Sequence, residues 1–367
     1  MAEGLDLRGE QRPTTGVDVA RLARLSQATV SLVLSGRAGG IGVSAATQKR
    51  VISAAAELGY TPNRAAQSLR RRRTDTITFM TSDLGNPYIA ETFDAVQRAA
   101  QERGYVVTLV VARSEEAELA AIERLRGGAA DGLIMSGGSI RVDAGVRALV
   151  ARGVACVVLQ HASLDPAIPC VRVDLEEGGA MAARHLIALG HRRIAHITDR
   201  RHYAQRPNDR LEGYRRALRE AGIAFEPAWL AEADNSLAGG CEAILALMRQ
   251  AWPRPTAVFV YNDRMAVGAL RALRSLGLRV PRDVAVVGFD GIALGEFVDP
   301  ELTTVEHPHL ELGRLAARLL LDRLEGGAPQ SGVRTLPMRL KVRRSCGWCA
   351  ADGSKPVRGI EANSPTM

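Results

Sequence analysis

The sequence lacks the features that mark several specialised classes of protein. No stretch approaches the ~18 uninterrupted apolar residues of a membrane-spanning helix, so we expect no membrane protein. Met1 to Pro13 alternates acids, arginine and glycine without an apolar signal core, which predicts a cytoplasmic protein. The five cysteines, scattered from Cys156 to Cys349, are odd in number and fit a reducing compartment better than a disulfide framework.

Motifs of common enzyme classes are missing too. No Gly-x-Gly-x-x-Gly follows the first expected strand, and both a phosphate-binding loop and Gly-x-Ser-x-Gly are absent. Cys346 and Cys349 have a metal-like spacing, but a closed zinc site needs two more ligands, which His307 and His309 would supply only by an accident of the fold. We therefore predict no enzyme activity, no cofactor and no bound metal.

What the sequence does have is an uneven charge. Its 367 residues, 46% of them hydrophobic, are enough for two or three domains with buried cores. The net charge is +8, yet residues 1–75 hold 12 Lys/Arg against 6 Asp/Glu and the rest of the chain is nearly neutral. A short basic head on a neutral body indicates that the head meets a polyanion.

Three helices are predicted in the head. Thr15 to Asp18 has the spacing of a capping box and begins a helix that ends near Arg24. Ser26 caps a second helix, 27–34, and Ser44 a third that reaches Leu58. The expected core residues are Val19, Leu22, Ala23, Val30, Val33, Leu34, Val51, Ala55 and Leu58. The tight connection between the first two helices is typical of a helix-turn-helix, whose second helix enters the DNA major groove.

The segment 63–75 has two interpretations. It is either a solvated linker with an arginine run at Arg70–Arg73, or a short helix that folds only on DNA. We favour the second.

From Thr76 onward, short apolar runs alternate with amphipathic helices, which predicts parallel sheets covered on both faces, in two series. The first series has runs at 77–80, 106–111, 132–135 and 155–159, with helices near 89–103, 117–126, 144–152 and 178–189. The second has runs at 194–197, 257–260 and 285–288, with helices near 210–221, 237–250, 265–276 and 310–324. Met338, Leu340 and Val342 alternate with basic residues and predict an edge strand. Ligands of such sheets bind beyond the carboxyl ends of the strands.

Taken in order, eight segments make the chain resemble the lac repressor and purine repressor family of bacterial transcription regulators. They are Asp18–Ala23, Ser26 with Ala28–Ser31, Leu58–Arg64, Asp83–Tyr88, His185–Leu186 with Leu189–Ala195, Asn262–Gly268, Val286–Asp290 and Leu302–Val305. The resemblance implies a helix-turn-helix head and a core of two doubly wound parallel-sheet lobes, like a periplasmic binding protein, that close on a small effector. It also implies a dimer. Because the tail after Cys349 has no apolar heptads, we expect no coiled-coil joining pairs of dimers.

The resemblance assigns DNA contacts by position. Gln27, Ala28 and Ser31 would face base edges and Thr29 a phosphate. Leu69 would be a wedge in the minor groove. The remaining contacts implied are Ser35, Asn63 and Arg64.

The head also departs from the family pattern. Arg24 and Leu25 stand where the turn commonly has glycine, and Leu32 stands where a base-reading arginine is common. Leu32 faces either DNA or the core. The loop 37–42 looks longer than usual.

The effector residues implied are Asn86, Tyr88, Ser136, Arg210, Asn262, Phe289 and Asp290, with Gln160 and His307 as weaker candidates. Their chemistry suits vicinal hydroxyls, since Arg210 offers donors, Asp290 acceptors and Tyr88 a stacking face. Structural roles are open beside these: Arg210 pairing with Asp209 or Glu212, Asn262 capping a helix, and Tyr88 packing in the core.

The predicted organisation is a disordered segment 1–13, a DNA-binding domain 14–62, a hinge 63–75, a two-lobed core 76–346 and a disordered tail 347–367. We expect a repressor that binds a pseudo-palindromic operator in duplex DNA as a homodimer, with a carbohydrate effector and no membrane partner. The effector is either an inducer or a co-repressor. The alternative is a sugar-binding receptor or sugar-modifying enzyme whose head is a protein-interaction module.

Overall fold

The computed structural model describes residues 14–34, 42–61, 73–137, 140–160, 165–200 and 209–347. The chain forms two compact units, Met1–Thr74 and Asp75–Met367, and each is described by itself. Within the described ranges, no helix has both the length and the apolar character needed to cross a membrane.

The first unit contains α1 (Gly16–Ala23), α2 (Gln27–Leu34) and α3 (Ala45–Glu57), as the sequence predicts. Side chains cap all three helices. The Thr15 N–H donates to the Asp18 carboxylate at 2.9 Å, and the Thr29 N–H donates to Ser26 Oγ at 3.1 Å. Ser44 accepts from the Thr47 N–H at 3.3 Å. The buried core residues are Val19, Ala20, Ala23, Val30, Val33, Val51, Ala54 and Ala55.

Two details of the head were not predicted. Leu22 is 42% exposed, so its assignment to the core was wrong: the face of α1 packed in the core carries Val19, Ala20 and Ala23. Arg24 ends α1 in the left-handed conformation, with φ of 51°. That conformation explains why glycine suits this turn, because a side chain at positive φ is strained.

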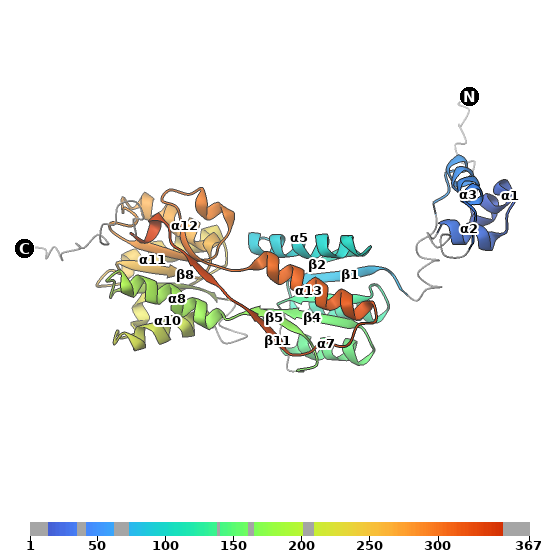
Figure 1. Ribbon diagram of the computed structural model, residues 1–367. Coiled ribbons are helices and arrows are strands. Elements are labelled where there is room, and N and C mark those ends of the chain that lie inside the picture. Colours follow the sequence, from blue (N-terminus) through green and yellow to red (C-terminus); the bar gives the residue numbers. More distant parts are fainter. Residues whose placement is uncertain are drawn as a thin grey trace, which may run out of the picture. The chain divides into compact units, whose positions relative to one another are not determined.

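The second unit contains two lobes, each built on a six-stranded sheet (Figure 1). The strand order is β11-β5-β4-β3-β1-β2 in lobe 1 and β12-β10-β9-β8-β6-β7 in lobe 2. All pairs are parallel except β12 with β10, the predicted edge strand. The strands of lobe 1 are β1 (Thr76–Thr81), β2 (Val106–Val111), β3 (Gly132–Ser136), β4 (Ala155–Leu159), β5 (Cys170–Val173) and β11 (Val333–Leu336). Those of lobe 2 are β6 (Ile194–Asp199), β7 (Leu230–Ala233), β8 (Ala257–Val260), β9 (Ala285–Asp290), β10 (Thr303–Glu306) and β12 (Arg339–Lys341).

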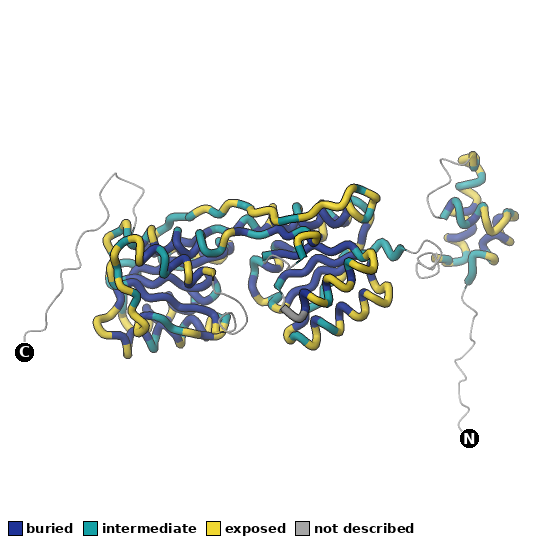
Figure 2. Tube along the Cα trace, turned by 90° about the horizontal axis from the view of Figure 1, so that it is seen from below, coloured by how far each residue is buried: buried dark blue, intermediate teal, exposed yellow. Residues whose placement is uncertain are grey.

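Helices cover both faces of each sheet, and the strands between them are largely buried (Figure 2). In lobe 1 these are α5 (Pro87–Glu102) with α13 (His309–Leu324), and α6 (Glu115–Arg126) with α7 (Ile140–Ala151). In lobe 2 they are α8 (Leu175–Ala188) with α10 (Asp209–Glu220), and α11 (Leu237–Gln250) with α12 (Asp263–Ser275). Short 3₁₀ turns lie at Pro227–Trp229, Ala293–Glu296 and Arg344–Cys346.

The two series read from the sequence do not correspond to the two lobes. Helix α8 is the last helix of the first series but packs in the core of lobe 2. Helix α13 is the last helix of the second series but packs on lobe 1. The reason is that the chain crosses between the lobes three times, at residues 173–175, 306–309 and 336–339. Amphipathic periodicity shows which face of a helix is buried but not which sheet buries it.

Candidate functional site

The first candidate surface is the start of α2. Gln27 and Ala28 are exposed, and Thr29 and Ser31 are half-buried on the same short helix. The Ser26 hydroxyl holds the Thr29 N–H and also bonds the Thr29 hydroxyl at 2.8 Å, which fixes the first turn. The helix therefore presents an amide side chain and a methyl group outward from a rigid turn.

Leu32 is half-buried on α2. The half-buried hydrophobic residues that pack against the described core of the head are Leu25, Leu34, Val43, Leu58 and Tyr60, and Leu32 is not one of them. This packing favours an outward position for Leu32 over the core position. Four other predicted contacts, Ser35, Asn63, Arg64 and Leu69, lie outside the described residues.

The second candidate site lies where carboxyl ends of strands from both lobes meet. Ser136 ends β3 and Gln160 follows β4 in lobe 1, while Asp199, Asn262 and Asp290 stand at the ends of β6, β8 and β9 in lobe 2. Asn86 and Tyr88 come from the loop and first turn of α5. The predicted effector residues thus come from both sheets, and the contacts described next join the lobes through them.

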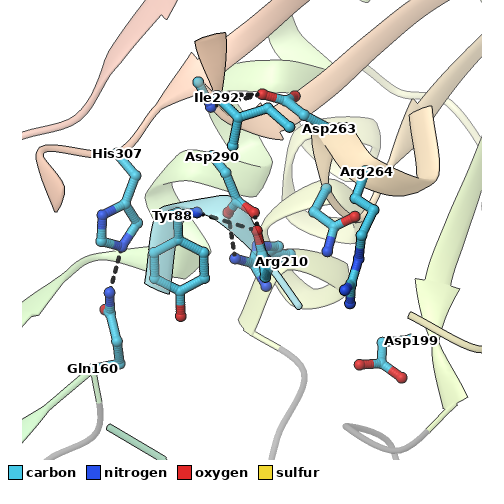
Figure 3. A network of polar contacts seen from close by, with 12 residues as sticks. Tyr88, Gln160, Asp199, Arg210, Asp263, Arg264, Asp290, Ile292 and His307 are labelled. Atoms are coloured by element: carbon cyan, nitrogen blue, oxygen red, sulfur yellow. Dashed lines mark hydrogen bonds and ion pairs between the residues drawn. The ribbon is translucent and has the colours of Figure 1, made fainter. Parts of the chain in front are cut away.

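Arg210 and Asp290 form the centre of this site (Figure 3). Arg210 Nη2 lies 3.4 Å from Asp290 Oδ1, and both side chains are buried. The guanidinium lies 4.2 Å from the ring centres of both Tyr261 and Phe289. From lobe 1, Asn86 Nδ2 donates to Asp290 Oδ2 at 3.0 Å. Arg210 therefore pairs with Asp290 and not with its sequence neighbours, and Asp290 is held from both lobes.

Electrostatics at this centre follow from burial. Burial raises the pKa of the Asp290 carboxyl, and the positive charge of Arg210 opposes that rise. Asp290 also has a φ of 107°, an unusual conformation for a residue with a side chain. Such strain is maintained only where the surrounding contacts fix it, and it is common at functional sites.

Tyr88, His307 and Gln160 form a second group beside it. The Tyr88 and His307 rings are 5.3 Å apart between centres, and Gln160 Nε2 contacts His307 Nε2. Tyr88 also packs against the core of lobe 1, so its structural role and its place in the site coexist. Burial lowers the pKa of His307 to about 3, with the charges of Arg210 and His309 adding to the effect. His307 is therefore neutral near pH 7 and acts as a hydrogen-bonding group.

Asn262 caps α12, as the structural interpretation predicts, because its Oδ1 accepts from the Met265 N–H at 2.9 Å. It also reaches across the site, since its Nδ2 donates to Asn235 Oδ1 at 2.7 Å. Its neighbour Asp263 is fully buried and accepts hydrogen bonds from Gly291, Ile292 and Thr304 at 2.7–2.9 Å. Asp263 thereby fixes the backbone that follows Asp290.

Sequence reasoning missed Tyr261 and Asp199, and also four residues of the polar network: Asp83, Asn235, Asp263 and Arg264. Asp83, Asp263 and Arg264 lie inside segments that carried the family resemblance, and these three follow strands that the sequence predicted. Inspecting every polar residue after each apolar run would have found those three. Asn235 follows β7, which the sequence did not predict.

Two parts of the chain match known protein families. Residues 17–63 match the family described as bacterial regulatory proteins, lacI family, and residues 183–346 match the periplasmic binding protein-like domain. The chain is 35% identical to the ribose operon repressor of Haemophilus influenzae, over 87% of this chain and 94% of that protein.

Two solved structures are similar over most of the chain. The lac repressor dimer bound to operator and the anti-inducer ONPF has a TM-score of 0.80 at 30% identity, covering 91% of this chain and 99% of that one. A complex of the transcriptional regulator CelR with cellobiose has a TM-score of 0.68 at 34% identity, covering 91% of this chain and 100% of that one.

Proposed function

The chain belongs to the lacI family of bacterial regulatory proteins, and from this premise we propose how it recognises its operator and its effector. It is a DNA-binding transcriptional repressor and not an enzyme. The family predicted from the sequence is confirmed, and the alternative of a receptor or sugar-modifying enzyme is set aside. We propose that it acts in the cytoplasm as a homodimer on a pseudo-palindromic operator.

In this proposal residues 14–62 are the DNA-binding domain, 63–75 the hinge and 76–346 the effector-binding core. The exposed side chains of Gln27 and Ala28 on the capped first turn of α2 are the observation that carries the proposed reading of bases. The amide of a glutamine can bond both N6 and N7 on the major-groove edge of adenine, and a methyl group contacts the methyl group of thymine. Thr29 would contact a phosphate, and the hinge would place Leu69 in the minor groove.

For the effector we propose a carbohydrate or a related polyol bound between the lobes. Support comes from the hydrogen-bonding groups of Asn86, Arg210, Asn262 and Asp290, which converge from both lobes beside aromatic rings. Such a mixture of apolar faces and a few fixed polar groups is typical of sites for small molecules, and several fixed hydrogen-bonding groups suit the hydroxyls of a polyol. A ribose operon repressor and a cellobiose complex among the similar proteins agree with this class of ligand.

The reading of bases is tested by Gln27→Ala. After selection of the preferred operator from random duplexes, the variant should bind it about 1–3 kcal/mol more weakly, because one bidentate base contact is lost. Binding to a random duplex should change much less, since phosphate contacts supply that affinity. Equal losses on both duplexes, measured at one salt concentration, would show that Gln27 does not read a base.

The assembly is tested by sedimentation at micromolar concentration. A dimer is expected, because the family's similar structure is a dimer on its operator and the tail offers no coiled-coil heptads. A stable tetramer that survives deletion of residues 350–367 would contradict the proposed assembly.

A further inference from the structure

We propose that Arg264 is a positioning residue that ties the two lobes together beside the effector site and holds Asn262 in place. The proposal rests on the effector function proposed above for that site. It concerns a side chain that is neither one of the predicted effector contacts nor part of the hinge.

The first step is the set of contacts that Arg264 makes. It is the second residue of α12 in lobe 2, and its Nη2 donates to Asp83 Oδ2 at 2.7 Å. Asp83 belongs to lobe 1, in the loop between β1 and α5. The same nitrogen donates to the main-chain oxygen of Asn235 and, at 2.8 Å, to its Oδ1 in lobe 2. One guanidinium thus bridges the lobes.

The second step is the shape of the lobe 1 loop. A Cβ atom on Gly85 would lie 2.9 Å from Arg264 Nη1 and 3.1 Å from Asp83 Oδ1. The same Oδ1 of Asp83 accepts the Gly85 N–H at 2.9 Å, which folds the loop around the carboxylate. Residue 85 must therefore be small for the guanidinium to reach its position, so the loop and the arginine fit together.

The third step connects this bridge to the effector site. Asn235 Oδ1 accepts from Arg264 and also from Asn262 Nδ2, and Asn235 Nδ2 donates to Asp199 at 3.2 Å. On the other side, the loop that holds Asp83 continues directly into Asn86 and Tyr88. Arg264 therefore fixes groups on both walls of the site without being one of the proposed contacts itself.

An exposed ion pair contributes little, and this one is only partly shielded: 15% of the Arg264 side chain is exposed and 37% of that of Asp83. Its effect would come from geometry. If the effector binds the joined arrangement of the lobes, apparent affinity falls in proportion to the fraction of molecules in that arrangement. We expect a change of about tenfold, within the usual range of coupling between sites.

The direct test is hydrogen exchange on the full-length protein without effector. Arg264→Gln and Asp83→Asn should each speed exchange of amides in 83–88 by about tenfold. The double variant should be no faster than either, because both substitutions remove the same ion pair between Arg264 and Asp83, and an asparagine at position 83 still offers an oxygen to the Gly85 N–H. Arg279→Gln is the matched control, since Arg279 pairs with Asp283 at 2.8 Å within lobe 2, and it should change nothing in 83–88. Unchanged exchange in the single variants, or additive effects in the double one, would overturn the proposal.

A calorimetric titration with ribose and with cellobiose separates this proposal from the proposed function. If the wild type binds either sugar, Arg264→Gln should raise Kd about tenfold while Arg279→Gln stays within about twofold. A Kd unchanged by Arg264→Gln would refute the link to the effector site even if exchange is faster. If neither sugar binds, these two effectors are excluded, and the exchange experiment alone decides whether Arg264 ties the lobes.

Discussion

Two buried carboxylates, close together in lobe 2, differ in what compensates their burial. Asp290 faces the Arg210 guanidinium and receives a hydrogen bond from Asn86. Asp263 has three hydrogen-bond donors around it, while the nearby charge of Asp290 opposes its ionisation. Hydrogen-bond donors alone compensate a buried carboxylate for its lost hydration less than a neighbouring cation does. The carboxyl groups of Asp263 and Asp290 should therefore titrate differently.

The pH dependence of stability should therefore report on Asp263. Burial, with the charge of Asp290 adding to it, raises the pKa of the Asp263 carboxyl to about 8, against the three hydrogen bonds that lower it. Between the unfolded pKa, about 4, and this value the folded protein binds more protons. The contribution of Asp263 to the free energy of unfolding is therefore largest below the unfolded pKa. It decreases as pH rises toward 8, by at most about 1.4 kcal/mol per pH unit.

Asp263→Asn removes that titration while keeping an acceptor, and the Thr304 hydroxyl can reverse its role toward the new amide. Urea unfolding of both proteins from pH 5 to 8 measures the effect. The wild type should lose free energy of unfolding relative to the variant as pH rises. A difference that is constant with pH would mean that the Asp263 carboxyl stays ionised in the folded protein.

At this scale the sequence predicted which residues stand at strand ends but not which of them touch. Asn86, Arg210 and Asp290 do come together, as proposed from the family pattern. The bridge from Asp83 to Arg264 spans 181 residues of chain, and Asn235 follows a strand that was not predicted. Partners of this kind depend on how two lobes meet, which no local pattern contains.

Helices α8 and α10 cross so closely that their glycines decide the geometry. A Cβ atom on Gly213 would lie 1.9 Å from the Glu176 oxygen, and one on Gly179 would lie 2.2 Å from the Arg210 oxygen. Backbone therefore packs on backbone at the turn of α10 that carries Arg210. Any residue with a side chain at these two positions must push the helices apart.

Gly213→Ala should accordingly lower stability by about 1–3 kcal/mol through overpacking, despite the better helix propensity of alanine. It should also weaken effector binding, because Arg210 lies one turn away. Gly145→Ala is the control: the nearest atoms to its Cβ would belong to side chains, Ile122 at 3.0 Å and Leu119 at 3.6 Å, which can move. Thermal unfolding of the two variants measures the contrast, and similar melting temperatures would show that the α8–α10 contact is looser than described.

Elements with a clear apolar pattern were predicted well, and short strands interrupted by polar residues were not. Strands β2 and β4 and helix α11 have the bounds expected from their apolar patterns. Strands β5, β7, β10 and β11 have four residues each and were missed, because polar residues interrupt their apolar runs. Strand β8 is equally short but uniformly apolar, and it was predicted. Helices α8 and α13 were assigned to the wrong lobes because the segments in which the chain crosses between the lobes are only a few residues long.

At the scale of the whole molecule, the three crossings make each lobe depend on distant parts of the chain. Lobe 1 includes α13 and β11, which follow most of lobe 2 in the sequence. Residues before and after lobe 2 therefore fold together in lobe 1. The head is a separate unit with its own small core. In the proposed function, a signal from the effector would reach the head along the segment that joins the two units.

The variant Arg210→Ala distinguishes an effector that is an inducer from one that is a co-repressor. The substitution removes a proposed effector contact in the core, while Gln27, on α2 of the separate head, is untouched. If the effector is an inducer, the variant should bind operator as tightly as the wild type and fail to release it when effector is added. If the effector is a co-repressor, the variant should not reach the tight operator-bound state at all.

Effector titration by calorimetry and operator binding on the same preparations distinguish these outcomes. Gln27→Ala is the reciprocal control, since it should bind effector normally and lose operator discrimination. Because Asp290 would lose its cationic partner in Arg210→Ala, the double variant with Asp290→Asn should recover folding stability without recovering effector binding. Unchanged effector affinity in both Arg210→Ala and Asp290→Ala would show that the pocket assignment is wrong, even with the role of the head intact.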